Sequence, residues 1–359
     1  MMDGRYAFKR DYNAIRKRKM LFVAGCILVA FVAMGLQLSV GKYDITFLES
    51  YGILFDHIMG VDPVTDLDAK KDYVVWDLRF PRALASLAVG AGLGVCGAAM
   101  QSTLRNPLAD PYTTGISAGA GLGACLALVS GVCVVPFLYG EAATVVNAFV
   151  FSLIPAFVII GISAVKKKVT SSMMILIGIA VMYVFTAFTT LLKLTASDES
   201  LEDVYMWNVG LLGKASWDNV WVMLLFALIG IVLFQYLSGR LNILTMSDGG
   251  ARSLGVDPKR ERLIVLVIVS LVTSVMVAFT GTIGFVGLVA PHMVRMFLGS
   301  DNRFLIPASA AFGAMLLICT DCLAKNIGVA GLPVGVVTAC IGGPLFLYLL
   351  LKQRKAIWN

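Results

Sequence analysis

The side chains that could do chemistry in this 359-residue sequence are few and scattered. Cys319 and Cys322 form a C-x-x-C pair, but it lies in an apolar stretch rather than near a βαβ pattern, which favours helix packing over redox chemistry. A membrane enzyme would need a convergent set of polar groups or a metal cluster, and the only two histidines, His57 and His292, do not supply one. We therefore predict no catalytic residue, no metal site and no cofactor.

Two glycine patterns resemble nucleotide-binding loops. Gly92, Gly94 and Gly97 spell G-x-G-x-x-G, whose dinucleotide-binding function requires a preceding strand and a βαβ unit. The flanking residues here are those of an apolar helix, so a small face for close helix packing is favoured. A Gly-Lys pair at residues 213–214 is followed by alanine, where a phosphate loop requires a hydroxyl residue. These patterns predict no ATPase site in this chain.

The elements that must hold these residues are membrane spans. The chain is 58% hydrophobic and 14% charged, with a mean hydropathy of +0.85, which is more apolar than a soluble domain. A helix needs about 20 residues to cross a hydrocarbon core of about 30 Å. Charge-free intervals of about this length occupy residues 20–41, 83–104, 111–140, 142–165, 169–192, 219–239, 263–294, 304–320 and 326–351.

One of these nine intervals, residues 263–294, is too long for a single crossing because it would extend about 48 Å as a helix. We expect it to break at Thr280–Gly281–Thr282, where a glycine stands between β-branched residues. The break raises the count to ten spans, and the predicted fold is an all-α polytopic membrane protein.

Charge at the chain ends predicts the orientation. Basic residues near helix ends favour the cytoplasm, and both termini are basic, with lysines or arginines at 16–19 and at 352, 354 and 355. Two cytoplasmic termini need an even number of spans, which agrees with ten. The basic residues cluster at the ends of apolar runs, unlike a nucleic-acid-binding patch, so the net charge of +7 predicts no nucleic-acid partner.

This orientation predicts a basic cytoplasmic segment at 1–19, a single transmembrane domain at 20–352 and a cytoplasmic tail at 353–359. Residues 42–77 form an acidic extracytoplasmic segment, for which a solvated connection and a docking role both stay open. Residues 240–262 form the longest cytoplasmic loop, with a short helix-forming stretch that we expect to end at Gly255. Such a helix lying under the membrane is a candidate docking element.

The polar and helix-breaking motifs resemble those of one family. The sequence resembles the iron-siderophore, haem and cobalamin permease family of type II ABC importers, which shares R-x-P-R, N-P-L-A-x-P, A-R-x-L-G, G-F-V/I-G-L-x-x-P-H-x-x-R and L-P-x-G-V-V-T-A-x-x-G-x-P. In this chain the motifs stand at residues 79–82, 106–111, 251–255, 284–295 and 332–344. Five motifs in order, over roughly residues 76–352, make a chance match improbable.

The resemblance implies roles for particular residues. The loop that couples to the ATPases comprises Gly250, Ala251, Arg252, Leu254 and Gly255. The residues that dock a binding protein are Arg79, Arg82 and Lys325, where lysine keeps the charge of the family's arginine but not its bidentate geometry. The cytoplasmic gate comprises Asn106, Pro107, Leu108, Thr170 and Ser171. Further family-motif positions are Gly284, Phe285, Gly287, Pro291, His292, Arg295, Pro333 and Gly335.

The resemblance also implies the assembly. We expect a non-catalytic permease subunit in a bacterial or archaeal cytoplasmic membrane, with a second permease copy (identical or paralogous), two cytoplasmic ATPases and an extracytoplasmic binding protein. The favoured substrate is an iron complex, most of all a ferric siderophore, with haem or cobalamin as alternatives. A stand-alone secondary transporter or channel is the alternative of a different class. An ion-driven carrier usually places carboxylates or histidines near the midplane, where this sequence has almost none.

Overall fold

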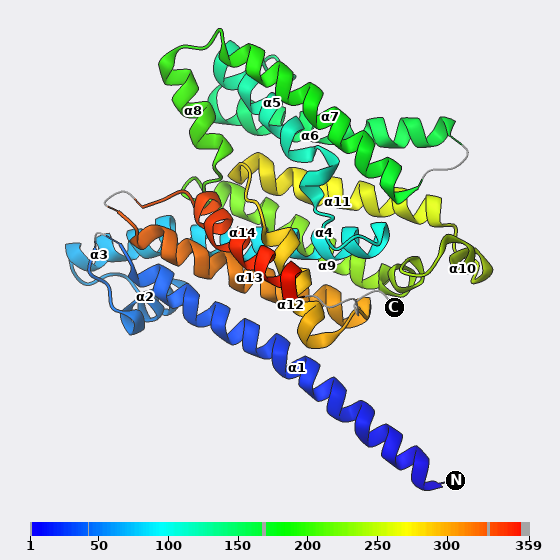
Figure 1. The fold of residues 1–359 in the computed structure, drawn as a ribbon. Helices are drawn as coiled ribbons and strands as arrows, with labels where there is room; N and C mark the ends of the chain where they lie inside the picture. The colour runs from blue at the N-terminus through cyan, green and yellow to red at the C-terminus, as the bar shows by residue number, and fades with distance from the viewer. Residues whose placement is uncertain (1, 42, 167–169, 329–330, 353–359) are drawn as a thin grey trace.

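The computed structural model describes residues 2–41, 43–166, 170–328 and 331–352. They form a bundle of helices, most of which are roughly parallel or antiparallel to one another (Figure 1). The N-terminus of α1 (Met2–Ser39) and the short helix α10 (Asp248–Ser253) lie at one end of the bundle. Helices α2 (Phe47–Met59), α3 (Asp66–Tyr73) and α8 (Asp198–Asn208) lie at the other end. This arrangement agrees with the orientation predicted from charge, because α10 and the N-terminus lie at the same end, the predicted cytoplasmic side.

Seven helices in the described part of the chain are long and apolar enough to cross a membrane, and three further helices are apolar but shorter. Seven are long: Lys17–Ser39 of α1, Asp66–Leu104 (which joins α3, the π-helical segment η1 at Val74–Arg79, and α4 at Phe80–Leu104), α6 (Gly140–Val165), α7 (Ser171–Lys193), α9 (Trp217–Leu244), α11 (Pro258–Thr280) and α13 (Asn302–Asn326). Three are shorter: α5 (Ile116–Ser130), α12 (Val286–Leu298) and α14 (Val334–Lys352). The prediction of a helical membrane fold is confirmed, and the seven long and three shorter apolar helices coincide with the ten predicted spans.

Helix α4 lies at the centre of the core, and glycines bring it close to its neighbours. A Cβ atom added at Gly90 would lie 2.3 Å from the carbonyl oxygen of Gly313 in α13, and one at Gly94 would lie 2.3 Å from that of Ser309. Gly97 approaches the backbone of Gly287 in α12 in the same way. No side chain fits at these contacts, so the G-x-G-x-x-G pattern is a helix-packing face, as predicted.

The segment predicted to be extracytoplasmic is folded over residues 43–77. Helices α2 and α3 each begin with a capping box, formed by Thr46 with Glu49 and by Thr65 with Asp68, which explains why these polar stretches become helices. Neither helix is predicted from the hydropathy of the sequence. All seven cysteines are free thiols, including the C-x-x-C pair, in which the Cys322 thiol donates to the carbonyl oxygen of Ala33.

Aromatic contacts attach this segment to the spans. His57 lies 2.9 Å from the Asp72 carboxylate and stacks on Trp76 at a centroid distance of 4.0 Å. The Trp217 indole at the start of α9 donates to the carbonyl oxygen of Trp76 at 3.1 Å. The segment therefore forms a small cap on the outer ends of α4 and α9.

Candidate functional site

The overlong apolar interval is broken at the predicted place. Helix α11 ends at Thr280, and Gly281 adopts φ 68° and ψ −164°, a conformation that only glycine adopts without strain. Irregular backbone at membrane depth needs polar partners within the protein. Here the Ile283 amide donates to the Tyr112 hydroxyl at 3.2 Å, and the Leu211 amide donates to the Thr280 carbonyl at 2.7 Å. The backbone around the break is thus stabilised by hydrogen bonds from other parts of the chain.

Helix α12 follows this break and carries most of the G-F-V-G-L motif. Phe285 precedes the helix in the left-handed region, with φ 68°, and its ring lies against Gly342 and Gly343 of α14. Pro291 lies inside α12, as expected. The Gly335 amide at the start of α14 donates to the carbonyl of Gly210 at 3.3 Å, and Pro333 directly precedes that helix.

Two buried side chains of α12 connect it to different neighbours. The Arg295 guanidinium donates to the side-chain oxygen of Gln101 in α4, and the Gln101 amide group donates to the carbonyl of Leu288 at 3.3 Å. The His292 ring packs edge-on against Phe346 of α14, with centroids 5.8 Å apart. The predicted i, i+3 pair therefore holds α12 between α4 and α14.

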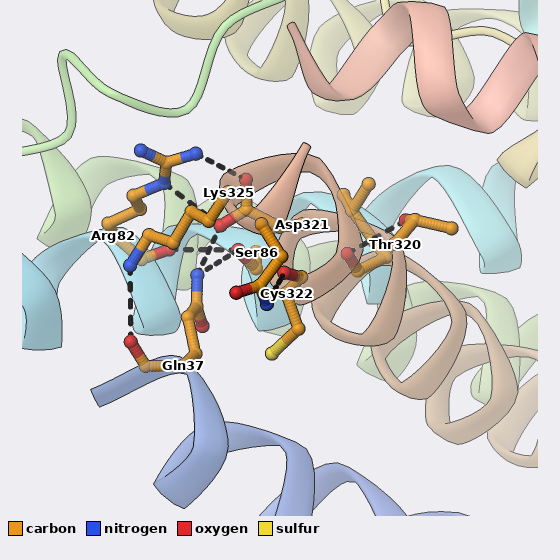
Figure 2. A network of polar contacts seen from close by, with 9 residues as sticks. Gln37, Arg82, Ser86, Thr320, Asp321, Cys322 and Lys325 are labelled. Carbon is orange, nitrogen blue, oxygen red and sulfur yellow. Dashed lines mark hydrogen bonds and ion pairs between the residues drawn. The ribbon is translucent and has the colours of Figure 1, made fainter. Parts of the chain in front are cut away.

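At the extracytoplasmic end, a buried ion network joins α1, α4 and α13 (Figure 2). Asp321 of α13 is fully buried, and Arg82 of α4 donates to both of its oxygens, at 2.9 and 2.7 Å. The Gln37 side chain of α1 also donates to Asp321 and lies within 3.4 Å of the Ser86 hydroxyl. Lys325 donates to the Gln37 carbonyl at 3.2 Å. Two of the predicted docking residues, Arg82 and Lys325, thus meet in one network.

The third predicted docking residue, Arg79, faces inward. Its side chain is only 7% exposed, and it donates to the carbonyl oxygens of Leu38, Ser39 and Tyr43. The last carbonyls of a helix lack intrahelical partners, and a cation at that end is favourable. In this structure Arg79 closes the C-terminus of α1, and Arg82 is the more accessible of the two arginines, with 22% of its side chain exposed.

At the cytoplasmic end, the coupling-loop candidate is a short helix on a charged anchor. Ser247 caps α10, and the helix stops at Leu254 and Gly255, where φ is 78°. The Asp248 carboxylate accepts from Arg262 at 3.0 and 2.7 Å and from Arg105 at 2.5 Å. These hydrogen bonds, first of all those from Arg262, lower the pKa of Asp248 below its usual range.

The C-terminal end of α10 is exposed among the described residues. Leu254 is 58% exposed, whereas Ala251 is buried against the spans. Gly250, Arg252 and Gly255 lie on the same turn and complete the predicted coupling set. The short helix ending at Gly255 is confirmed, and its contact with an ATPase stays a prediction.

The predicted gate residues occupy two connections between helices. The Asn106 side chain accepts from the Leu108 amide at 2.9 Å across Pro107, and the preceding Arg105 is left-handed, with φ 51°. Thr170 caps α7 by accepting from the Met173 amide, just before Ser171.

The elements that follow the two gate connections contact each other. A Cβ atom at Gly178 would lie 2.7 Å from the backbone of Thr114 in the 3-10 helix η2 (Pro111–Thr114), which directly follows the Asn106 turn. This contact joins α7, which follows Thr170, to η2, which follows Asn106.

Sequence reasoning missed several residues that hold these sites together. Gln37 and Arg262 carry much of the two ion networks, and neither stands in a family motif. A glutamine inside an otherwise apolar span was the available signal, because polar groups in spans need partners. From its position, Arg262 is expected to be an exposed basic residue at the cytoplasmic end of a span. The fold shows instead that its side chain is only 2% exposed.

Comparisons with known proteins agree with this arrangement. The FecCD transport family model matches residues 27–352. The Fe(3+)-citrate import system permease protein YfmD of Bacillus subtilis is 36% identical over 96% of this chain and 99% of its own length. The hemin transport system permease protein HmuU of Yersinia pestis is 36% identical over 78% of this chain and 84% of its own.

A solved structure has the same fold over nearly the whole chain. It is an inward-facing conformation of a metal-chelate type ABC transporter, with a TM-score of 0.80 and 27% identity, covering 92% of this chain and 99% of the other. The sequence matches and the shared fold agree, and the chain belongs to the FecCD transport family.

Proposed function

We propose that this chain is the permease subunit of an ATP-driven importer that carries a ferric siderophore or a related iron complex into the cytoplasm. The observation that carries this proposal is α10, a short helix whose Leu254 side chain projects unburied at the cytoplasmic end. An exposed apolar side chain beside a rigid anchor suits insertion into a cleft of a partner protein. The proposed partner here is the ATPase.

The anchor explains how movement at α10 reaches the spans. Asp248 joins α10 to Arg105, just after the end of α4, and to Arg262, in the first turns of α11. A displacement of α10 by nucleotide-driven closure of the ATPases therefore acts on two spans at once. Helix α11 leads to the break at Gly281, so its movement is delivered to the irregular segment before α12.

The proposed assembly also includes a second permease copy and an extracytoplasmic binding protein. Only Met174 and Gly178 are buried in α7 within this chain, so the exposed face of that helix is available to a second copy or to lipid. We propose Arg82 and Lys325 as docking residues at the outer end, where Arg82 keeps some exposure. The iron complex is favoured because an iron-citrate permease is similar over nearly its whole length.

Reconstitution tests this function. The permease, its ATPase and its binding protein, taken from neighbouring genes, are placed in liposomes, and uptake of ⁵⁵Fe-siderophore is measured with and without ATP. Leu254→Ala should lower uptake and substrate-stimulated ATP hydrolysis. Leu225→Ala is the matched control, because Leu225 is similarly exposed, at 54%, but lies on a membrane span.

The outcomes separate the parts of the proposal. ATP-dependent uptake of haem or cobalamin, without iron-siderophore uptake, would overturn the substrate and leave the importer standing. Uptake that an ion gradient drives without the ATPase would instead show a secondary transporter. Equal activity of the Leu254→Ala and Leu225→Ala proteins would remove α10 from the coupling role.

A further inference from the structure

A groove with a volume of 720 Å³ opens between α1, α4, α9 and α13. Its lining is entirely apolar, and small residues form much of it, including Ala88 and Ala91 of α4 and Ala310, Ala311 and Ala314 of α13. Because alanine side chains leave space where larger ones would fill it, the groove is a consequence of the sequence of these spans. It lies wholly within segments that are long and apolar enough to cross a membrane.

The groove has the depth of one membrane leaflet. On α1 its lining extends from Val23 to Met34, which corresponds to about 16 Å along a helix. Half of a hydrocarbon core of about 30 Å is about 15 Å. The groove therefore matches in length an acyl chain that extends through one leaflet.

The cytoplasmic end of the groove is polar and basic. One helical turn beyond the last lining residues stand Lys19 on α1, Arg303 on α13 and Gln235 on α9, four residues from Val23, Pro307 and Ile231 respectively.

Contacts at this end hold the three helices together. The Gln235 side chain donates to the Arg303 carbonyl at 3.3 Å, and the Lys19 ammonium lies 4.1 Å from the centroid of the Phe304 ring. Among the residues whose side chains the structure describes, neither Lys19 nor Arg303 forms an ion pair with a carboxylate.

We propose that this groove binds an anionic phospholipid of the cytoplasmic leaflet, with one acyl chain between α1 and α13 and the phosphate group at Lys19 and Arg303. The apolar walls match a hydrocarbon chain, and the two cations match a negative headgroup at the depth where that headgroup lies. The lipid would fill the space between α1 and the core that no side chain fills.

Photo-cross-linking tests this site. The purified protein is placed in vesicles of phosphatidylcholine and phosphatidylglycerol at 3:1, at low salt, with a trace of either lipid carrying a diazirine on its acyl chain. Cross-linked peptides are then mapped by mass spectrometry. We expect labelled phosphatidylglycerol to modify the groove segments of α1, α9 and α13 more than labelled phosphatidylcholine does, by about five-fold for each of the two charges.

Variants separate the contribution of the two cations to lipid binding from that of the apolar groove. Lys19→Gln with Arg303→Gln should abolish the preference for phosphatidylglycerol, and high salt should reduce it. Ala311→Leu with Ala314→Leu should lower labelling by both lipids by filling the groove. Arg252→Gln with Arg260→Gln is the matched control, because it removes two exposed charges on the same side, away from the groove. Size-exclusion profiles and thermal unfolding verify that each variant is folded.

Three results would overturn the proposal. These are equal labelling of the groove by the two lipids in the wild-type protein, labelling confined to other segments, and an unchanged preference after both cations are removed.

Discussion

The buried pair of Arg82 and Asp321 offers a quantitative test of how the extracytoplasmic end is held together. Asp321 is fully buried, and Arg82 satisfies both of its oxygens, at 2.9 and 2.7 Å. Removing one partner of a buried pair costs about 3–5 kcal/mol, because the other charge stays buried without compensation. Arg82→Ala should fall at the upper end of that range, since Asp321 cannot reach water.

Asp321→Ala should cost less, about 3 kcal/mol, because the remaining Arg82 side chain is already 22% exposed and can turn toward water. Removing both charges should destabilise the protein no more than Arg82→Ala alone. At roughly 2 °C per kcal/mol for a chain of this size, Arg82→Ala should lower the Tm by about 10 °C and Asp321→Ala by about 6 °C.

Thermal unfolding in detergent with a thiol-reactive dye measures these shifts without labelling the protein in advance. Cys26, Cys96 and Cys125 are buried and free, so they react only as the fold opens. Arg252→Ala serves as the control, since it removes an exposed charge and should change stability by no more than about 0.5 kcal/mol. If the losses for Arg82→Ala and Asp321→Ala simply add in the double variant, the two side chains are not coupled and the reasoning fails.

The remaining predictions concern α10 and the helix break. Leu254→Ala should leave the Tm within about 2 °C of wild type but weaken ATPase binding roughly ten-fold, measured by co-purification titration, because an apolar side chain is lost from the interface. Asp248→Asn should lower the Tm by about 6 °C, since Arg262 is almost fully buried beside it. The pKa of Asp248 is lowered in the folded protein, so its contribution to stability is present above the unfolded pKa of about 3.9 and is lost as pH falls through the folded pKa. The loss of Tm in Asp248→Asn should therefore be constant between about pH 5 and 8 and shrink below about pH 4. Gly281→Ala should strongly destabilise the segment between α11 and α12, because the φ of Gly281 is 68° and a Cβ atom would lie 2.0 Å from a carbonyl oxygen of α8. Gly284→Ala is the control, because a Cβ atom there would have no atom within 4 Å, and it should cost about 1 kcal/mol or less. Both effects are measured as Tm and expression level.

The number of spans and the helix break were predictable because both follow from length and composition. Charge-free intervals reveal where lipid is the solvent, and the excess length of residues 263–294 required a stop, which Gly281 supplies. Helices α2 and α3 were not predicted, since hydropathy carries no signal for polar helices. Their capping boxes, at Thr46 and Thr65, were the readable evidence.

Side-chain direction was the part that sequence could not provide. Arg79 and Arg82 are three residues apart at the same boundary, yet Arg79 turns to the end of α1 and Arg82 to Asp321. The choice depends on where the carbonyls of residues 38–43 and the carboxylate of α13 lie, which are contacts more than 35 residues away in sequence. A motif therefore located the charges but not their partners.

Helix α4 links the two charged ends of the protein. Arg82 near its start joins the outer network, and Arg105, just after its end, holds Asp248 beneath α10. Its 25 residues extend about 37 Å, so the helix spans the distance between the two networks without interruption.

The glycine contacts decide how α4 can respond when α10 moves. At Gly90 and Gly94 the backbones of α4 and α13 approach so closely that no methyl group fits, and Gly97 meets α12 in the same way. Sliding along such an interface would drive side chains into backbone, so we expect α4, α12 and α13 to move as one unit. If α10 moves as proposed, we expect the change in shape to be absorbed where the backbone is irregular, at residues 281–285 and in the turn at residues 105–110, which overlap two of the motifs on which the resemblance rests.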